Sequence, residues 1–294
     1  MLFRSTRAAS GAGRGRTGNR AIQPFVSAPE SQSAVDAGEF YDDMWQRYGH
    51  LDSASPAAFH RRRLILELCT RHAAGARQVL DAGCGQGELV QELRLGFPTA
   101  TLCAADVSLA SVRETKRLNP NLEVLQMDLS VPDFEQVYRQ YLGRFELITC
   151  SEVVEHIPDD CLAVERVARL LAPRGTLVLT VPGGKMSRFD ELIGHQRHYT
   201  AQRLRELSQH ANLEPLQVLA WGFPFQNLYR TAVRVASRVS MPKPGEPVQT
   251  PSNGRGLSGV LSAGYALFGR ALKPLFYLNR NFWGEQMLLV ARKR

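Results

Sequence analysis

The 294-residue sequence has no apolar run long enough to cross a membrane, since a spanning helix needs about 20 consecutive apolar residues. Its longest uncharged apolar stretch, residues 256–269, lies between Arg255 and Arg270. This stretch is expected to form either a packed lid helix or a surface that touches a membrane or a lipid-like substrate. We therefore predict no transmembrane segment, while a peripheral membrane contact stays open.

Cysteine is scarce, and no two cysteines form a Cys-x-x-Cys pair. The five residues are scattered, and their number is odd, which is not typical of a disulfide framework. Reduced thiols in a reducing compartment are the expectation, and the cytoplasm is the predicted location.

Acidic residues are absent from residues 1–29, which carry five arginines among alanine, glycine and serine. A segment with so few apolar residues is expected to be a disordered basic tail, assigned to residues 1–38. Its composition also suits a transit peptide, which would place the protein in an organelle. The whole chain carries a net charge of +8; with the tail set aside, the positive balance is modest and gives little support to a nucleic-acid partner.

Short apolar segments alternate with helical patterns from residue 78 onward. This alternation predicts parallel strands joined by helices, and therefore an α/β fold with a Rossmann-like, doubly wound, mostly parallel seven-stranded sheet. An insertion at residues 222–283 precedes the last strand. The expected strands are 79–82, 101–105, 122–127, 147–150, 176–181, 216–220 and 286–291.

A glycine-rich turn follows the first predicted strand and opens a helix, so a ligand can approach its backbone closely. The turn contains Gly83, Gly85 and Gly87, whereas a dinucleotide fingerprint places its third glycine three residues after the second. The tighter spacing favours a sulfonium amino acid over a pyrophosphate. Asp106 ends the next strand, where a carboxylate can accept hydrogen bonds from two ribose hydroxyls.

These residues resemble the first motif of class I S-adenosylmethionine-dependent methyltransferases, which in this chain reads Val79–Gly87. The resemblance continues through residues 105–108, 126–129, 148–157 and 171–177. Within this class, the sequence is similar to the ubiquinone-biosynthesis O-methyltransferases. The resemblance implies S-adenosylmethionine as cofactor. The implied cofactor-binding residues are Arg63, Asp81, Gly83, Cys84, Gly85, Gly87, Asp106, Val107, Met127, Asp128, Leu129 and Ser151.

The resemblance also implies roles for parts of this set. The glycines and Asp81 would surround the methionine part of the cofactor, and Asp128 would border the adenine. Arg63 would reach the cofactor carboxylate, although its basic neighbours fit a solvated face equally well. The domain would span residues 39–221, with a helical lid at 39–75 and a cofactor core at 76–185. Residues 222–283 would shape the acceptor site, and 284–294 would supply the last strand.

Glu152, Glu155 and His156 lie at i, i+3 and i+4, so one helical turn would point all three the same way. Two carboxylates and an imidazole in one place suit a divalent metal such as Mg²⁺, and the resemblance associates the same pattern with metal binding. His195 or His198 would add a fourth ligand. Without a metal, His156 is a candidate general base, and His156 and Glu155 are the predicted catalytic residues.

The predicted function is methyl transfer to a hydroxyl group of a small or lipid-like molecule. An RNA 2′-O-methyltransferase is the first alternative, and it requires a basic cleft near Glu155. A non-catalytic binding module with the same fold is the second alternative. C- or N-methylation, which would need no metal, is a third.

Overall fold

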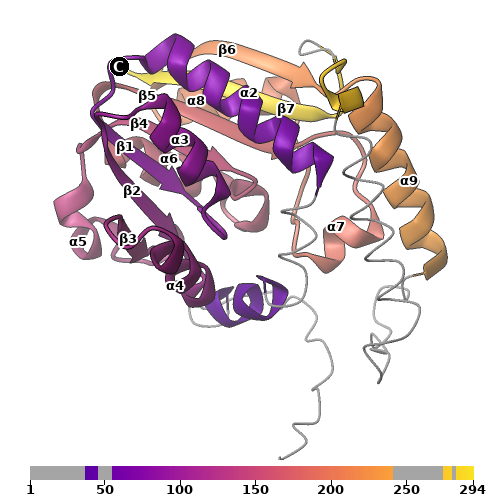
Figure 1. The fold of residues 1–294 in the computed structure, drawn as a ribbon, viewed down its shortest axis with the longest axis horizontal. Coiled ribbons are helices and arrows are strands. Elements are labelled where there is room, and N and C mark those ends of the chain that lie inside the picture. Colours follow the sequence, from indigo (N-terminus) through magenta and orange to yellow (C-terminus); the bar gives the residue numbers. More distant parts are fainter. Residues whose placement is uncertain (1–36, 46–54, 241–273, 280–282) are drawn as a thin grey trace, which may run out of the picture.

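A seven-stranded sheet forms the centre of the computed structural model, with the strand order β3-β2-β1-β4-β5-β7-β6 (Figure 1). The structure describes residues 37–45, 55–240, 274–279 and 283–294. This sheet confirms the predicted fold class. The strands are β1 Gln78–Ala82, β2 Thr101–Asp106, β3 Glu123–Gln126, β4 Phe145–Ser151, β5 Leu171–Pro182, β6 Leu213–Trp221 and β7 Gln286–Lys293.

Parallel pairing joins the first five strands, and the last strand breaks the pattern. β1 pairs in parallel with β2 and β4, and β7 runs antiparallel between β5 and β6. Val79, Leu80, Leu147 and Ile148 are completely buried, because helices cover both faces of these central strands. Their near-continuous apolar runs in the sequence follow from this double burial.

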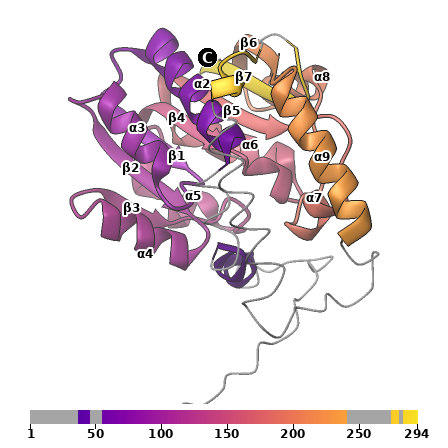
Figure 2. The same cartoon turned by 45° about the vertical axis from the view of Figure 1, so that its right-hand side comes forward.

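Helices on the two faces of the sheet form separate hydrophobic clusters (Figures 1 and 2). On one face, α2 and α3 bury Ile65, Leu68 and Leu93, and on the other, α6 and α8 bury Val164 and Leu204. The helices are α2 Pro56–Ala73, α3 Glu88–Gly96, α4 Leu109–Leu118, α5 Phe134–Val137, α6 Asp160–Leu170, α7 Arg188–Leu192, α8 Ala201–His210 and α9 Phe225–Ser240, with 3₁₀ turns η1 Arg139–Tyr141 and η2 Val154–His156.

Several segments predicted from the sequence lie outside the described residues. These are most of the basic tail, residues 46–54 of the predicted lid and the apolar stretch at 256–269. Within the predicted insertion, α9 is the main described element, and it lies beside α7 (Figures 1 and 2). Among the described residues, no helix is long and apolar enough to cross a membrane. All five cysteines are free thiols, as expected.

Candidate active site

A cavity of about 1000 Å³ opens at the carboxyl ends of β1, β2 and β4, which is where doubly wound sheets bind ligands. The helical segment 37–45, drawn in indigo, lies beyond the arrowheads of β1 and β2 (Figure 1). This segment, the loops after the strands, and α9 supply the walls. The cavity therefore extends from the glycine loop at one end to α9 at the other.

The glycine loop adopts a conformation that only glycine tolerates well. Gly83 and Gly85 have φ values of +82° and +52°, in the left-handed region. A Cβ on Gly83 would lie 2.1 Å from Cγ2 of Val153, and one on Gly85 would lie 2.8 Å from the Trp45 ring. Both positions therefore require glycine, because of the backbone conformation and because side chains pack directly against the loop.

Three aspartates border the loop end of the cavity, and two of them retain a buried carboxylate oxygen that accepts no hydrogen bond from any described residue. Asp81 Oδ1 accepts a hydrogen bond from Thr149 Oγ1 at 2.7 Å, and Oδ2 is the unpartnered oxygen. Asp128 Oδ2 is in the same position. Asp106 instead accepts from the N–H groups of Gly85 at 2.8 Å and Ser108 at 2.9 Å. This arrangement suits a ligand rich in N–H and O–H donors.

Most of the residues predicted to bind the cofactor line this cavity, and two do not. Gly87 lies behind the loop as the N-cap of α3, where a Cβ would lie 2.9 Å from Thr115 Oγ1. Arg63 stacks over the Tyr277 ring at 4.4 Å and does not reach the cavity. The predicted residues that line it are Asp81, Gly83, Cys84, Gly85, Asp106, Val107, Met127, Asp128, Leu129 and Ser151.

The segment 37–45 covers the cavity with aromatic side chains, as a lid would. Tyr41 packs edge-on against His156, with ring centroids 5.3 Å apart, and Trp45 covers Gly85. Asp42 fixes the segment by accepting hydrogen bonds from Ser108 Oγ at 2.5 Å and the Ala110 N–H at 3.0 Å. The segment is therefore anchored to the N-terminus of α4.

The predicted helical turn from Glu152 to His156 is wrong. β4 remains extended through Ser151, and Glu152 reverses the chain with a φ of +56° before the short 3₁₀ turn η2 begins at Val154. Glu152 consequently does not converge with Glu155 and His156 and forms an ion pair with Arg61, with 3.6 Å between Oε2 and Nη1. No single helical turn therefore points Glu152, Glu155 and His156 in the same direction.

Glu155, His156 and His195 converge instead, with one potential ligand atom from each within 4.8 Å of the others. Glu155 is completely buried, and neither carboxylate oxygen has a hydrogen-bond partner among the described residues. Burial raises the pKa of Glu155 well above its usual range and lowers the pKa of His156 to about 4 and of His195 to about 2. Both imidazoles are therefore neutral near pH 7, the state in which imidazole binds metals.

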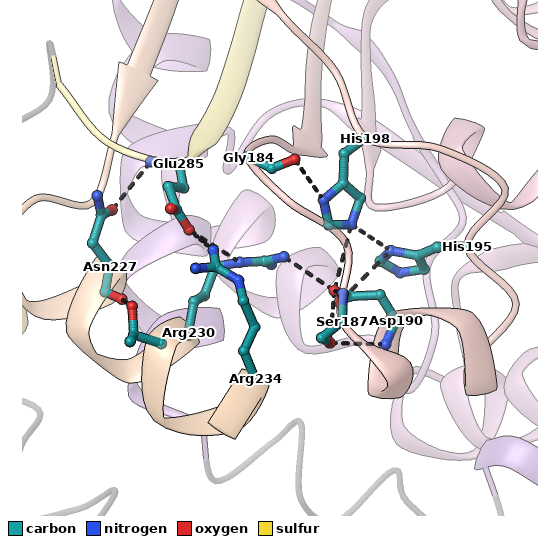
Figure 3. A network of polar contacts seen from close by, with 10 residues as sticks. Gly184, Ser187, Asp190, His195, His198, Asn227, Arg230, Arg234 and Glu285 are labelled. Carbon is teal, nitrogen blue, oxygen red and sulfur yellow. Dashed lines mark hydrogen bonds and ion pairs between the residues drawn. The ribbon is translucent and has the colours of Figure 1, made fainter. Parts of the chain in front are cut away.

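A chain of hydrogen bonds fixes which nitrogen of His195 keeps its lone pair (Figure 3). The Gly184 carbonyl lies 3.2 Å from His198 Nδ1, and a carbonyl can only accept, so Nδ1 carries the proton. His198 is neutral because burial lowers its pKa, so its Nε2 accepts from His195 Nδ1 at 3.3 Å. Nε2 of His195 is left with a free lone pair.

Several charged residues of the cavity wall were not singled out in the sequence. Arg61 and Arg62 line the cavity in place of Arg63, and Arg230 and Arg234 reach it from α9. The spacing of Arg230 and Arg234 by four residues, on a segment with helical apolar periodicity, is the signal that could have identified the pair. Asp190, which also lines the cavity, belongs to no motif that could be recognised in the sequence.

The sheet order, the glycine loop and the buried aspartates together define a Rossmann-like methyltransferase class. Residues 57–218 match the family model described as a methyltransferase domain, and the chain belongs to this family. The match confirms the predicted class, the S-adenosylmethionine-dependent methyltransferases.

Among curated relatives, the ubiquinone biosynthesis O-methyltransferase of Xanthomonas oryzae pv. oryzae is 34% identical over 152 residues. The match covers 50% of this chain and 61% of that relative, so the chain spans about three fifths of the curated relatives it matches. The relatives therefore support the catalytic domain and leave the acceptor to be determined.

Two solved structures share the fold at low identity. Phosphoethanolamine N-methyltransferase 2 of Haemonchus contortus, in complex with S-adenosyl-L-methionine, gives a TM-score of 0.54 at 15% identity, covering 90% of this chain and 60% of that one. The [4+2]-cyclase SpnF gives a TM-score of 0.55 at 18% identity, covering 90% and 97%. Since proteins with such different names share the architecture, the fold alone does not determine the reaction.

We expect the affinity for S-adenosylhomocysteine to fall as the pH falls from 7 to 5.5. Burial raises the pKa of Asp81 to about 7 and that of Asp106 to about 6, so both carboxylates gain protons in this window. A protonated carboxyl no longer attracts the ammonium group or accepts as well from ribose, and the loss is roughly 10- to 100-fold. Isothermal titration calorimetry across this range measures it. A pH-independent affinity would contradict the assignment, and Asp81→Asn should flatten the profile.

Proposed function

We propose that this protein transfers a methyl group from S-adenosylmethionine to a hydroxyl group of a small or lipid-like acceptor. The observation that carries the proposal is the convergence of the buried Glu155 with His156 and His195, two residues that line the cavity whose other end holds three aspartates. The aspartates provide acceptors for the ammonium, ribose and adenine groups of the cofactor. The O-methyltransferase relatives are consistent with a hydroxyl acceptor.

The same three residues fit a divalent metal. The completely buried Glu155 carboxylate has two oxygens without hydrogen-bond partners among the described residues, and a bound cation would compensate its charge. His195 offers Nε2, because His198 occupies its other nitrogen, so His195 is the third ligand we propose in place of Glu152. Two imidazoles with one carboxylate favour a transition metal such as Zn²⁺ over the predicted Mg²⁺.

A metal bound there supplies Lewis acidity that lowers the pKa of an acceptor hydroxyl. The protein itself aligns the reactants, because methyl transfer is an in-line displacement whose rate depends on orientation. Tyr41 and Trp45 exclude water above the glycine loop, and Asp81 and Asp106 hold the cofactor at a fixed position. Without a metal, His156, which is neutral near pH 7, is available to accept the hydroxyl proton instead.

The proposal also includes a role for the insertion at 222–283 and a cellular compartment. The part of residues 222–283 that the structure describes contributes α9 to the cavity, which supports a role of this segment in shaping the acceptor site. Free cysteines, four of them buried, are consistent with a reducing compartment such as the cytoplasm.

Incubation of the purified protein with methyl-labelled S-adenosylmethionine and a fractionated cell extract tests the proposal. We expect label in the small-molecule or lipid fraction, loss of transfer after chelation, and recovery when Zn²⁺ or Mn²⁺ is added back. Label in the RNA fraction would instead support a 2′-O-methyltransferase. Transfer that survives chelation would contradict the metal, and no transferred label at all would favour a binding module.

A further inference from the structure

The α9 end of the cavity holds two arginines that the proposed transfer does not use. Arg230 and Arg234 lie one helical turn apart and both line the cavity, with side chains that are only 13% and 17% exposed. Like charges at this spacing on a helix repel one another, and burial increases the cost of leaving them uncompensated. The pair therefore requires anions close to it.

Two acidic residues of the chain meet this need, Glu285 from outside the cavity lining and Asp190 from within it (Figure 3). Glu285 forms an ion pair with Arg234, and its Oε2 also lies 3.9 Å from Nε of Arg230. Asp190 Oδ2 lies 3.4 Å from Nη2 of Arg230. Glu285 is not among the residues that line the cavity, whereas both arginines are. Glu285 thus holds the guanidinium groups in place while they face the cavity.

Other contacts already engage the Asp190 carboxylate. Its Oδ2 accepts hydrogen bonds from the Ser187 N–H at 2.7 Å and from Ser187 Oγ at 2.8 Å, in the capping box of α7. Asp190 therefore divides its charge among several donors and compensates Arg230 only in part.

The cavity has three aspartates at its loop end and, beside Asp190, a pair of arginines at its α9 end. Asp81, Asp106 and Asp128 lie at the loop end, where the cationic cofactor is proposed to bind, and the two arginines lie at the α9 end. His195 lies between His156 and the arginines, since its ring centroid is 4.7 Å from that of His156 and its Nδ1 is 3.9 Å from Oδ1 of Asp190, the carboxylate beside Arg230. An acceptor whose hydroxyl reaches His195 would place the rest of its structure beside the arginines.

We propose that Arg230 and Arg234 bind an oxyanion of the acceptor, either a carboxylate or a phosphate, and so select hydroxyl compounds that carry an acidic group. A guanidinium group presents parallel N–H donors that match two oxygens of one carboxylate or phosphate. This inference rests on the proposed function, because it defines the substrate class of the same cavity. It explains why α9 places cations rather than apolar side chains at this wall.

Binding of matched ligands to the protein saturated with S-adenosylhomocysteine tests this site. The ligands are catechol, 3,4-dihydroxybenzoate and 3,4-dihydroxyphenylphosphonate, which share a ring and differ in the acidic group. We expect at least one acid to bind at least tenfold more tightly than catechol, and its identity distinguishes a carboxylate from a phosphate preference. Arg230→Gln and Arg234→Gln should reduce this ratio to near one, and Arg234→Lys should retain part of it.

Arg71→Gln is the matched control, since Arg71 is an exposed α2 residue paired with Glu67 and should leave the ratio unchanged. Circular dichroism and thermal melting establish that each variant is folded. Equal binding of catechol and both acids to the natural protein, no binding of either acid, or a ratio that survives both glutamine substitutions would overturn the proposal. Calorimetry needs no turnover, so acid-selective binding without methyl transfer would count against the proposed function alone.

Discussion

Asp106→Asn is expected to weaken binding of S-adenosylhomocysteine by at least about 100-fold. The Asp106 carboxylate accepts the Gly85 and Ser108 N–H groups, and in the proposed complex it also accepts from ribose hydroxyls. An asparagine keeps the shape but turns one acceptor into a donor, which opposes an N–H group of the loop. Hydrogen bonds to a charged acceptor contribute about 1.5–3 kcal/mol each, and the loss of two accounts for this factor. Calorimetry with the purified variant measures the change.

Asp133→Asn provides the control for this substitution, because Asp133 is an exposed loop residue outside the cavity lining. Its affinity should equal that of the natural protein. If Asp106→Asn remains folded and binds the cofactor product as tightly as the control, Asp106 does not hold the ribose, and the orientation proposed for the cofactor is wrong.

Glu155→Gln is expected to abolish metal binding and to lower the rate of methyl transfer by at least about 100-fold, equivalent to ~2.7 kcal/mol of transition-state stabilisation. The amide has nearly the same volume as the carboxylate but no charge, and Glu155 is the only carboxylate in the group with His156 and His195. Metal content by mass spectrometry and initial rates with labelled cofactor measure the two effects. Affinity for S-adenosylhomocysteine should not change, since Glu155 does not line the cavity.

Glu165→Gln serves as the matched variant, because Glu165 is a surface residue of α6 that pairs with Arg169. It should retain both metal and activity. A Glu155→Gln protein that keeps its metal would show that other ligands hold the ion, and one that keeps full activity without metal would leave His156 as the base.

The sheet could be predicted from the sequence because its strands are short apolar runs between helical patterns. All seven predicted strands lie within the observed strands or overlap them closely, and helix α4 has the predicted bounds, residues 109–118. α9 was not predicted individually, since no helix was assigned to residues 225–240 within the insertion at 222–283. α9 lines the cavity because of how the chain folds, and no local sequence motif indicates this position.

The site was predictable only where a residue follows a strand or belongs to the glycine loop. Arg61, Arg62 and Arg63 are consecutive on α2, and each is rotated by about 100° from the next, so the sequence does not tell which arginine faces the cavity. The Glu152–His156 segment was taken for a helical turn because its spacing fits one. The left-handed conformation of Glu152 is set by the end of β4, and no residue type in the sequence signals it.

β7 lies between β5 and β6, although it comes later in the chain than either of them. During synthesis, β1 to β5 emerge from the ribosome first and can pair in parallel before α9 and β7 exist. β6 has no strand to pair with in the described sheet until β7 arrives, so one edge of β5 stays open in the nascent chain. The cofactor half of the protein can therefore form early, while the α9 wall is completed only after the final strand has been made.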